Sequence, residues 1–332
     1  MNTATAKVRA AANARKRLWL AAQLIGVVAT LALLLGLVIR PEPSLNVLWN
    51  LLIPLVPASL LISPAIWRNV CPLATLNTLS NRSAGTRKLG ANILPSAGLV
   101  GIVLLGVLVP ARRFLFNTDG LALAVTVTAV AAAAIALGSL FDLKAGFCNS
   151  ICPVLPVERL YGQRPLLRVG NPRCRPCTAC TASACIDLDA TRSVGQTLGA
   201  AGRSHAWLRS AFGAFAAAFP GFVIGYYTLA DGPLSAAGSV YLHIALWAAA
   251  SYLVTALLVH LSGATYRSSM AILAAAAVGL YYWYAADTVT TAWGIAGTPT
   301  FALRGVALVF VAFWAWRAAF QPARTLRNHR AA

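Results

Sequence analysis

Residues 121–141 read LALAVTVTAVAAAAIALGSLF, an uncharged run rich in Ala, Leu and Val. A helix that crosses a bilayer needs about 20 mostly apolar residues, because the hydrocarbon core is about 30 Å thick and each residue rises about 1.5 Å. This run is therefore predicted to span a membrane. Seven more runs of similar character lie at 18–39, 45–65, 92–110, 211–230, 236–261, 268–286 and 301–320. The sequence thus predicts an all-α multi-pass membrane protein with about eight transmembrane helices.

The composition of the whole chain agrees with this class. Of its 332 residues, 59% are hydrophobic and 11% are charged, whereas soluble domains are about a quarter charged. These values exclude an ordinary soluble domain and a disordered chain. The net charge of +19 is typical of chains that bind nucleic acid or membranes. No basic segment has the interleaved aromatic or glycine residues that nucleic-acid binding uses, so the expected partner is the lipid bilayer and no nucleic acid.

The basic residues also predict an orientation, because Lys and Arg accumulate in the cytoplasmic connections of membrane proteins. With the N-terminus in the cytoplasm, 23 of the 27 Lys and Arg residues are cytoplasmic, and the exceptions are Arg40, Arg112, Arg113 and Arg304. We therefore expect a protein of the cell's inner (cytoplasmic) membrane with both termini cytoplasmic. The first run follows basic residues as a signal peptide would, but it is too long and has no small-residue cleavage site, so it is expected to remain as a span.

All seven cysteines lie between residues 71 and 185, on the predicted cytoplasmic side, where a reducing environment disfavours disulfides. The densest group is Cys174-x₂-Cys177-x₂-Cys180-x₄-Cys185. Three thiolates at x₂ spacing let one loop wrap a [4Fe–4S] cluster, although a bacterial ferredoxin run continues with C-x₃-C-P and here Ile186 replaces the proline. A zinc site or free thiols are the alternatives. Zinc fits less well, because it normally uses two separate C-x₂-C pairs.

Two further cysteine motifs follow predicted spans at the same membrane face. Cys148-Asn-Ser-Ile-Cys152-Pro153 has the C-x₃-C-P form that ends a ferredoxin run. Trp67-Arg-Asn-Val-Cys71-Pro72 has the same form, with a tryptophan in place of the first cysteine. The alternative is that these are unrelated helix-end cysteines beside prolines that stop a helix.

These motifs divide the chain into three parts. Residues 1–141 form an N-terminal four-helix membrane part with the Cys71 loop, residues 142–210 a small cytoplasmic ferredoxin-like, cysteine-rich loop domain, and residues 211–332 a C-terminal four-helix membrane part. The middle part has a local charge of +5, which suits an anionic cluster but also follows from topology alone. In the third part, Gly221 and Gly225 form a small-xxx-small step that suits close contact with another helix. The alternative is chance, because the chain has 25 glycines.

With these motifs, residues 50–190 resemble the NapH/NosR/CcoG family of membrane-bound ferredoxin-like (4Fe-4S) proteins. The resemblance implies several spans, cysteine-bound clusters at the cytoplasmic face, and electron exchange with redox partner proteins, a membrane complex or quinol. The chain departs from the family pattern at Trp67, and it has one ferredoxin run where the family usually has two. The number of clusters, one or two, therefore stays open.

Two assignments of the ligands stay open, the first by analogy with paired ferredoxin runs and the second as the simpler interpretation, and both place Cys174, Cys177 and Cys180 on one cluster. In the first, Cys152 completes that cluster, while Cys71, Cys148 and Cys185 hold a second cluster with a non-cysteine fourth ligand. In the second, Cys185 completes the only cluster, and Cys71, Cys148 and Cys152 remain as a set of reactive thiols.

The remaining residues limit the other cofactors. His243 and His260 share one predicted span and lie 17 positions apart, about 25 Å along a helix, so they cannot ligate one haem from both faces, and haem is not expected. A quinone stays open, although the aromatic group at 281–284 with Trp293 is typical of an interfacial belt. No nucleotide-binding or hydrolase motif is present.

The sequence therefore predicts a membrane electron-transfer protein, whose activity, if it is an enzyme, would be that of a quinol dehydrogenase. Two alternatives stay open. One is a thiol–disulfide or metal reductase, or a maturation factor, that uses Cys71, Cys148 and Cys152. The other is a redox-silent anchor subunit whose metal only stabilises the loop.

Overall fold

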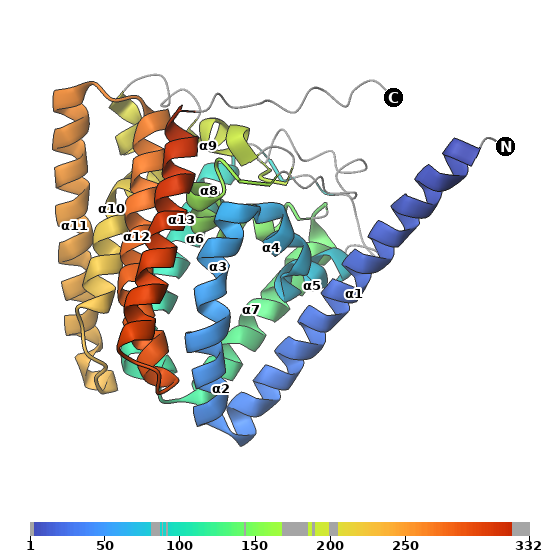
Figure 1. Ribbon diagram of the computed structural model, residues 1–332, viewed down its shortest axis with the longest axis horizontal. Coiled ribbons are helices and arrows are strands. Elements are labelled where there is room, and N and C mark those ends of the chain that lie inside the picture. The colour runs from blue at the N-terminus through green and yellow to red at the C-terminus, as the bar shows by residue number, and fades with distance from the viewer. Residues whose placement is uncertain are drawn as a thin grey trace.

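The computed structural model describes residues 3–80, 87, 89–90, 92–142, 144–167, 185–187, 190–198 and 205–320. Within these ranges the chain is α-helical, and the only β pairing is an isolated bridge between Arg87 and Phe141. Figure 1 shows helices α10 to α13 side by side on one side of the molecule and α1 crossing diagonally on the other. The predicted all-α class is confirmed.

Seven helical segments are long and apolar enough to cross a membrane, and they are Arg17–Ile39, Pro41–Ile62, Ser96–Phe116, Gly120–Leu140, Leu234–Ser262, Tyr266–Ala292 and Thr298–Phe320. These segments are consistent with a multi-pass membrane protein, and they correspond to seven of the eight predicted spans. The other predicted span, at 211–230, is α10 (Ala211–Tyr227), whose 17 residues fall short of that length.

The helices that make up the bundle differ in length between the two halves of the chain. The long ones besides α10 are α1 (Thr3–Ile39), α6 (Leu94–Ala111), α7 (Gly120–Leu140), α11 (Ala237–Ser262), α12 (Tyr266–Ala292) and α13 (Thr298–Phe320). The short α-helices are α2 (Pro41–Val47), α3 (Ile53–Ile62), α4 (Pro64–Val70), α5 (Pro72–Ser80), α8 (Leu155–Tyr161) and α9 (Ala190–Leu198). Single π- or 3₁₀-turns are η1 (Leu48–Leu52), η3 (Arg112–Phe116), η4 (Phe147–Ile151), η6 (His205–Arg209) and η7 (Leu234–Ala236).

Prolines explain the short helices of the N-terminal half. Pro41, Pro64 and Pro72 are the first residues of α2, α4 and α5. A proline is tolerated at the start of a helix, because its missing N–H would have no intrahelical partner there. Ser63, between α3 and α4, is extended, with φ −167° and ψ 112°. The second predicted span, 45–65, therefore ends earlier, at Ile62, and the chain continues through the separate helix α4 before it reaches Cys71.

Helix α10 is enclosed by other helices rather than by lipid. Eleven of its 17 residues are buried. A Cβ atom added at Gly221 would lie 2.0 Å from the Trp247 carbonyl oxygen, and one at Gly225 would lie 3.0 Å from the Cα atom of Ile244. Both contacts are with α11, so the close helix contact predicted from the two glycines is confirmed.

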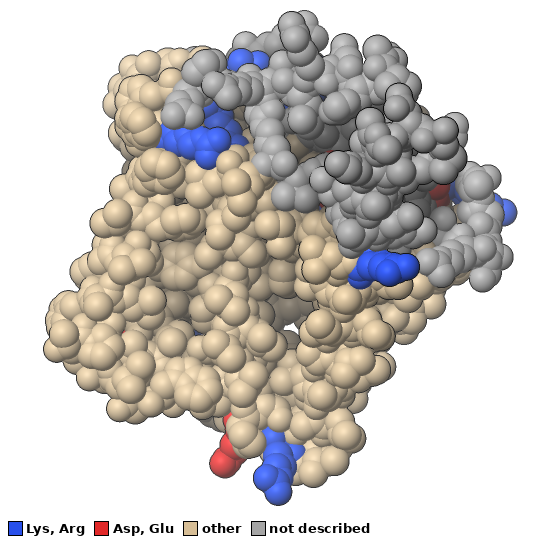
Figure 2. Space-filling model, turned by 45° about the vertical axis from the view of Figure 1, so that its right-hand side comes forward, with Lys and Arg blue, Asp and Glu red and all other residues tan. Residues whose placement is uncertain are grey.

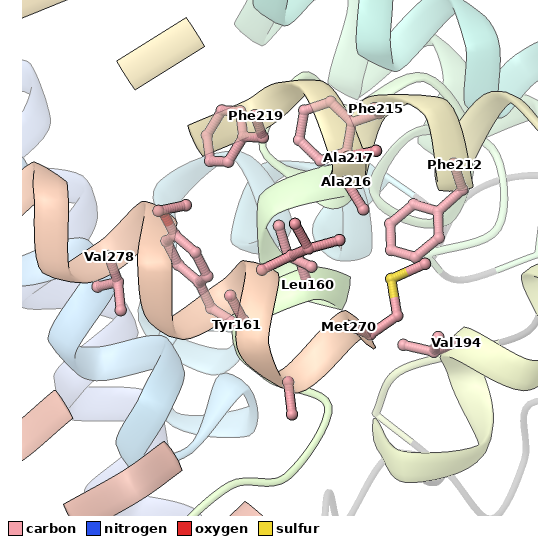
Figure 3. Close-up of a cluster of buried hydrophobic side chains, with 14 of the residues drawn as sticks. Leu160, Tyr161, Val194, Phe212, Phe215, Ala216, Ala217, Phe219, Met270 and Val278 are labelled. Atoms are coloured by element: carbon pink, nitrogen blue, oxygen red, sulfur yellow. The ribbon is translucent and has the colours of Figure 1, made fainter. Parts of the chain in front are cut away.

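The largest apolar core holds α8 against α10 and α12. Figure 3 shows Leu160 and Tyr161 of α8 between Phe215 and Phe219 of α10 and Val278 of α12. Next to this core, the Gln163 side-chain amide donates to the carbonyl of Met270 at 2.9 Å. Because α8 follows Cys152 directly, this core fixes the position of one of the cysteine motifs.

Tyr281 and Tyr282, which the sequence placed in an aromatic group typical of an interfacial belt, pack against other helices. Both are half-buried against the large core, whereas Trp283 and Trp293 are exposed. The Tyr282 hydroxyl donates to the Pro54 carbonyl at 2.8 Å and accepts from the Ala58 amide at 2.9 Å. In a regular helix these two α3 groups would bond each other directly. The Tyr282 hydroxyl is therefore inserted into the backbone of α3.

The charged side chains lie near two ends of the molecule, and Figure 2 shows a broad uncharged band between them. We call the end that carries η4 and α8 the thiol end. At the opposite end, Arg113 bonds Asp231 at 2.9 Å, and the Gly232 amide donates to the Arg113 carbonyl. The turn after α10 therefore lies beside the turn between α6 and α7, so α10 extends from one end of the bundle to the other.

Candidate functional site

Four of the seven cysteines fall within the described residues, and all four lie at the thiol end. Cys71 lies between α4 and α5, Cys148 is in η4, Cys152 ends η4, and Cys185 belongs to the segment 185–187. All are free thiols, and all are buried except Cys71, which is half-buried. Cys148 and Cys152 share a buried apolar cluster with Phe147, and Cys71 packs against it. Three cysteines from two distant motifs therefore meet.

The cysteines of the two Cys-Pro motifs have the same backbone conformation. Cys71 has φ −53° and ψ 124°, and Cys152 has φ −57° and ψ 124°. Each cysteine ends one helix, and its carbonyl accepts an amide from the helix that begins at or just after the following proline: Thr75 for Cys71 and Leu155 for Cys152. The similarity that the sequence shows at Trp67–Pro72 and Cys148–Pro153 is thus also a similarity of backbone.

Helix α6 supports the second of these turns through a glycine. A Cβ atom added at Gly101 would lie 2.9 Å from the carbonyl oxygen of Cys152. Real Cβ atoms almost never come so close to a backbone oxygen, so any larger residue at this position would displace the turn.

Arg68 is the centre of a buried polar network beside the cysteines. It is on α4, and its side chain is 2% exposed. Its guanidinium donates to Glu158 Oε2 at 2.5 Å, to Asp187 Oδ1 at 2.9 Å and to Asn149 Oδ1 at 2.7 Å. A longer contact of 3.5 Å reaches the carbonyl of Cys148. Arg68 thus joins α4, η4, α8 and the segment that contains Cys185.

Lys144 adds a second buried cation to this network. Its ammonium group donates to Asp187 Oδ2 at 3.0 Å and to the Arg68 carbonyl at 3.0 Å. Asp187 is thereby held by two cations, one on each carboxylate oxygen. Burial opposes its ionisation, but the positive charges of Arg68 and Lys144 outweigh burial and lower the pKa of Asp187 to about 2. The Asp187 side chain is therefore a carboxylate at neutral pH.

Two asparagines contact the cysteine sulfurs. The Asn149 amide nitrogen donates to Cys185 Sγ at 3.4 Å, and the Cys148 thiol donates to Asn77 Oδ1 at 3.9 Å. Asn77 is fully buried, and its own amide donates to the Ala134 carbonyl of α7 at 2.8 Å. Cys185 is therefore placed next to the turn that carries Cys148.

Burial controls the protonation of these thiols. Removal from water disfavours the thiolate and raises the pKa of Cys71, Cys148, Cys152 and Cys185, for Cys148 to about 12. Arg68 and Lys144 act in the other direction on Cys148, but burial is the larger effect. Without a bound metal these four groups are neutral thiols at pH 7.

The donor chemistry of the site suits a soft metal centre. In the described part of the chain, no three Cys, His, Asp or Glu side chains are grouped closely enough to hold a single metal ion. The four described cysteines thus do not form a compact zinc site by themselves. An iron–sulfur cluster places its thiolate ligands around a larger inorganic core, and nearby cations and N–H donors compensate its negative charge. Thiols next to Arg68, Lys144 and Asn149 fit these requirements.

The densest predicted ligand group lies outside the described residues. This applies to Cys174, Cys177 and Cys180 and to the neighbouring Arg173 and Arg175. Only Cys185 of the ferredoxin-type run is placed, and its sulfur lies beside the Asn149 amide and not in the interior of the large core. Both ligand assignments therefore remain predictions.

Sequence reasoning missed the polar residues that surround the cysteines, which are Arg68, Lys144, Asn149, Glu158 and Asp187. One signal was present. The chain has only eight acidic residues, and four of them, Glu158 and Asp187 included, fall in the cysteine-rich part 142–210. Acidic side chains that occur rarely in a membrane protein commonly have a defined partner.

Comparisons with protein-family models, with curated proteins and with solved structures found no match to this chain.

Proposed function

We propose that this protein is a membrane-embedded electron-transfer protein that holds one or two [4Fe–4S] clusters at its thiol end. It would relay electrons between the quinone pool, or a donor on that side of the membrane, and a redox partner protein or membrane complex. A bound cluster supplies one-electron chemistry, while the protein determines where the cluster lies and how easily it is reduced.

The observation that carries this proposal is the meeting of Cys71, Cys148, Cys152 and Cys185 at one end of the bundle. Three separate parts of the chain bring them there, and Cys185 is the last cysteine of the ferredoxin-type run. Thiols that only fill space in a core have no need of buried cations. Here Arg68 and Lys144, which are paired with buried carboxylates, lie near Cys148, and their positive charge favours its thiolate and lowers its pKa against the larger effect of burial.

We further propose eight membrane crossings, with both termini and the thiol end in the cytoplasm of the cell's inner membrane. The eighth crossing is α10, which runs between the two ends although it is only 17 residues long. Since α10 is surrounded by protein, it does not have to match the thickness of the lipid around it. The division of 23 to 4 among the basic residues supports the orientation.

The decisive experiment is chemical analysis of anaerobically purified protein, with iron and acid-labile sulfide measured per chain and EPR spectra recorded after reduction. About four irons with equal sulfide would indicate one cluster and about eight would indicate two. Protein that contains neither iron nor sulfide would refute the proposal. Zinc without sulfide would instead favour the redox-silent anchor.

The second candidate is a thiol–disulfide or metal reductase that uses Cys71, Cys148 and Cys152. The shared apolar cluster of these three thiols favours it. Their burial argues against it, because a buried thiol in apolar surroundings is a poor nucleophile. Rapid alkylation of these three cysteines in folded protein, with the run at Cys174 protected, would favour the reductase.

A further inference from the structure

We infer that Arg68 and Asn149 form a relay that directs an N–H group at the sulfur of Cys185. In this relay Asn149 tunes the electron affinity of whatever Cys185 binds, and Arg68 is the positioning residue that orients Asn149. The inference rests on the proposed iron–sulfur function and assigns a role to two residues around it.

The chemistry of the guanidinium fixes the orientation of the amide. An arginine side chain can only donate hydrogen bonds, whereas an asparagine amide has one accepting and one donating end. Arg68 lies 2.7 Å from Asn149 Oδ1, so the oxygen of the amide must face Arg68. The NH₂ group is then turned the other way, and it lies 3.4 Å from Cys185 Sγ. A flipped amide would place two donors against each other.

Arg68 also holds Cys185 from the other side. Its Nε atom bonds Asp187, two residues after Cys185, and Lys144 bonds the second oxygen of the same carboxylate. The Cys185 segment is therefore fastened at its sulfur through Asn149 and at Asp187 through two buried cations. A lysine in place of Arg68 could not serve these partners together, because it lacks the planar fork of donors.

An N–H donor to a ligand sulfur favours the reduced, more negative state of a cluster and raises its reduction potential. The relay therefore predicts that the cluster bound by Cys185 has a higher reduction potential than it would have without the Asn149 N–H group. In the assignment with two clusters, Cys185 shares the second cluster with Cys71 and Cys148. That second cluster is then the one that accepts electrons from the other.

The test compares four variants of the full-length protein in membranes or detergent. Asn149→Asp keeps the acceptor for Arg68 but has no N–H for the sulfur, and Asn149→Leu removes both contacts. Arg68→Lys disturbs the orientation of the amide. Ser150→Ala is the matched control, because Ser150 is a buried neighbour in η4 whose hydroxyl donates to the Gly146 carbonyl and, within the described residues, has no hydrogen bond to a sulfur. The midpoint potential is measured by EPR-monitored redox titration, with iron and sulfide measured in every sample.

We expect both Asn149 variants to lower the midpoint potential of one cluster, by about 59 mV for a tenfold change in a one-electron equilibrium, with metal content retained. Ser150→Ala should leave the potential unchanged. Unaltered potentials in both Asn149 variants, with iron and sulfide retained, would overturn the inference.

A second measurement separates the relay from the proposed function. The rate of alkylation by N-ethylmaleimide is followed for Cys185 and Cys152 in the same folded molecules by mass spectrometry. Arg68→Lys should accelerate the labelling of Cys185 several-fold and leave Cys152 unchanged, also in protein that carries no iron. Equal acceleration of both cysteines would mean general loosening of the fold and would overturn the positioning role.

Discussion

The buried charged side chains at the thiol end are stable there because each has a partner of opposite charge. Arg68 and Glu158 have side chains that are 2% and 5% exposed, and Asp187 is 3% exposed. Removing such charges from water costs several kcal/mol for each ion unless partners are close and well oriented. The network supplies those partners, so each of its members depends on the others.

Replacement of Arg68 by methionine should therefore destabilise the protein strongly. Glu158 and Asp187 would remain buried without their shared cation, and the loss of one partner of a buried pair costs about 3–5 kcal/mol. The control is Arg267→Met, since Arg267 is exposed and substitutions at exposed sites usually change stability by about 0.5 kcal/mol or less. Thermal unfolding in detergent measures both variants. Similar melting temperatures for the two would contradict the role of the network.

The proposed ligand run at residues 174–185 makes a second prediction at this scale. Cys177→Ser should abolish the EPR signal of the cluster that contains Cys174, Cys177 and Cys180, because serine is a poor ligand for cluster iron. Ser183→Ala, in the same part of the sequence, is the control and should keep the signal. A complete signal in Cys177→Ser would show that Cys177 is not a ligand.

At the scale of elements, the Tyr282 hydroxyl links α12 to the backbone of α3. Tyr282→Phe should leave the Ala58 amide and the Pro54 carbonyl without their partner and lower stability by about 1–3 kcal/mol. The control is Tyr284→Phe, because in the described residues the Tyr284 hydroxyl has no hydrogen bond, and the ring stacks on Tyr227 at 5.4 Å. Hydrogen exchange at the Ala58 amide reports the effect directly. Unchanged exchange in Tyr282→Phe would show that α3 closes without the hydroxyl.

The contact between α10 and α11 predicts that the same substitution, glycine to alanine, lowers stability at Gly221 but not at Gly305. Gly221→Ala places a methyl group against the Trp247 carbonyl, and overpacking of this kind costs about 1–3 kcal/mol. Gly305→Ala is the matched control in α13, where nothing lies within 4 Å of the added atom. It should be neutral or stabilising by about 0.5–1 kcal/mol, because glycine is a weak helix former. Melting temperatures that fall equally in both variants would contradict this packing.

Hydropathy predicts some elements closely and misses others for a physical reason. The run at 121–141 differs by one residue at each end from α7, since no proline interrupts it. Hydropathy does not detect the helix end at the extended residue Ser63 within the run 45–65, because Pro64 is followed by further apolar residues. The same run gave no hint that Cys71 lies a whole helix beyond its end.

The site was predictable only in its thiols. Cysteine spacing is local and can be read directly, whereas the partners of Arg68 are 81, 90 and 119 positions away. Such pairings depend on how α4, η4 and α8 pack, and no pattern in one segment reveals them. The aromatic residues show the same limit, because the sequence around Tyr282 does not reveal its hydrogen bonds to the backbone of α3.

For the whole molecule, the number of crossings determines on which side the chain ends. Alkaline phosphatase, which is active only outside the cytoplasm, should be active when fused after Thr118 and inactive when fused after Gly263 or Phe320, if α10 crosses the membrane. If α10 does not cross, the last three crossings are inverted, and the fusions after Gly263 and Phe320 become active. β-Galactosidase fusions at the same three positions provide the complementary control, because that enzyme is active only in the cytoplasm.

The long sequence separation of the buried ion pairs also orders the events of biosynthesis. Arg68 leaves the ribosome well before Asp187, its partner 119 positions later. Until that partner is translated, an incompletely paired guanidinium must remain in contact with water or a chaperone. Insertion of the first four helices can therefore precede closure of the thiol end, because Arg68 is only partly paired until the segment with Asp187 has been made.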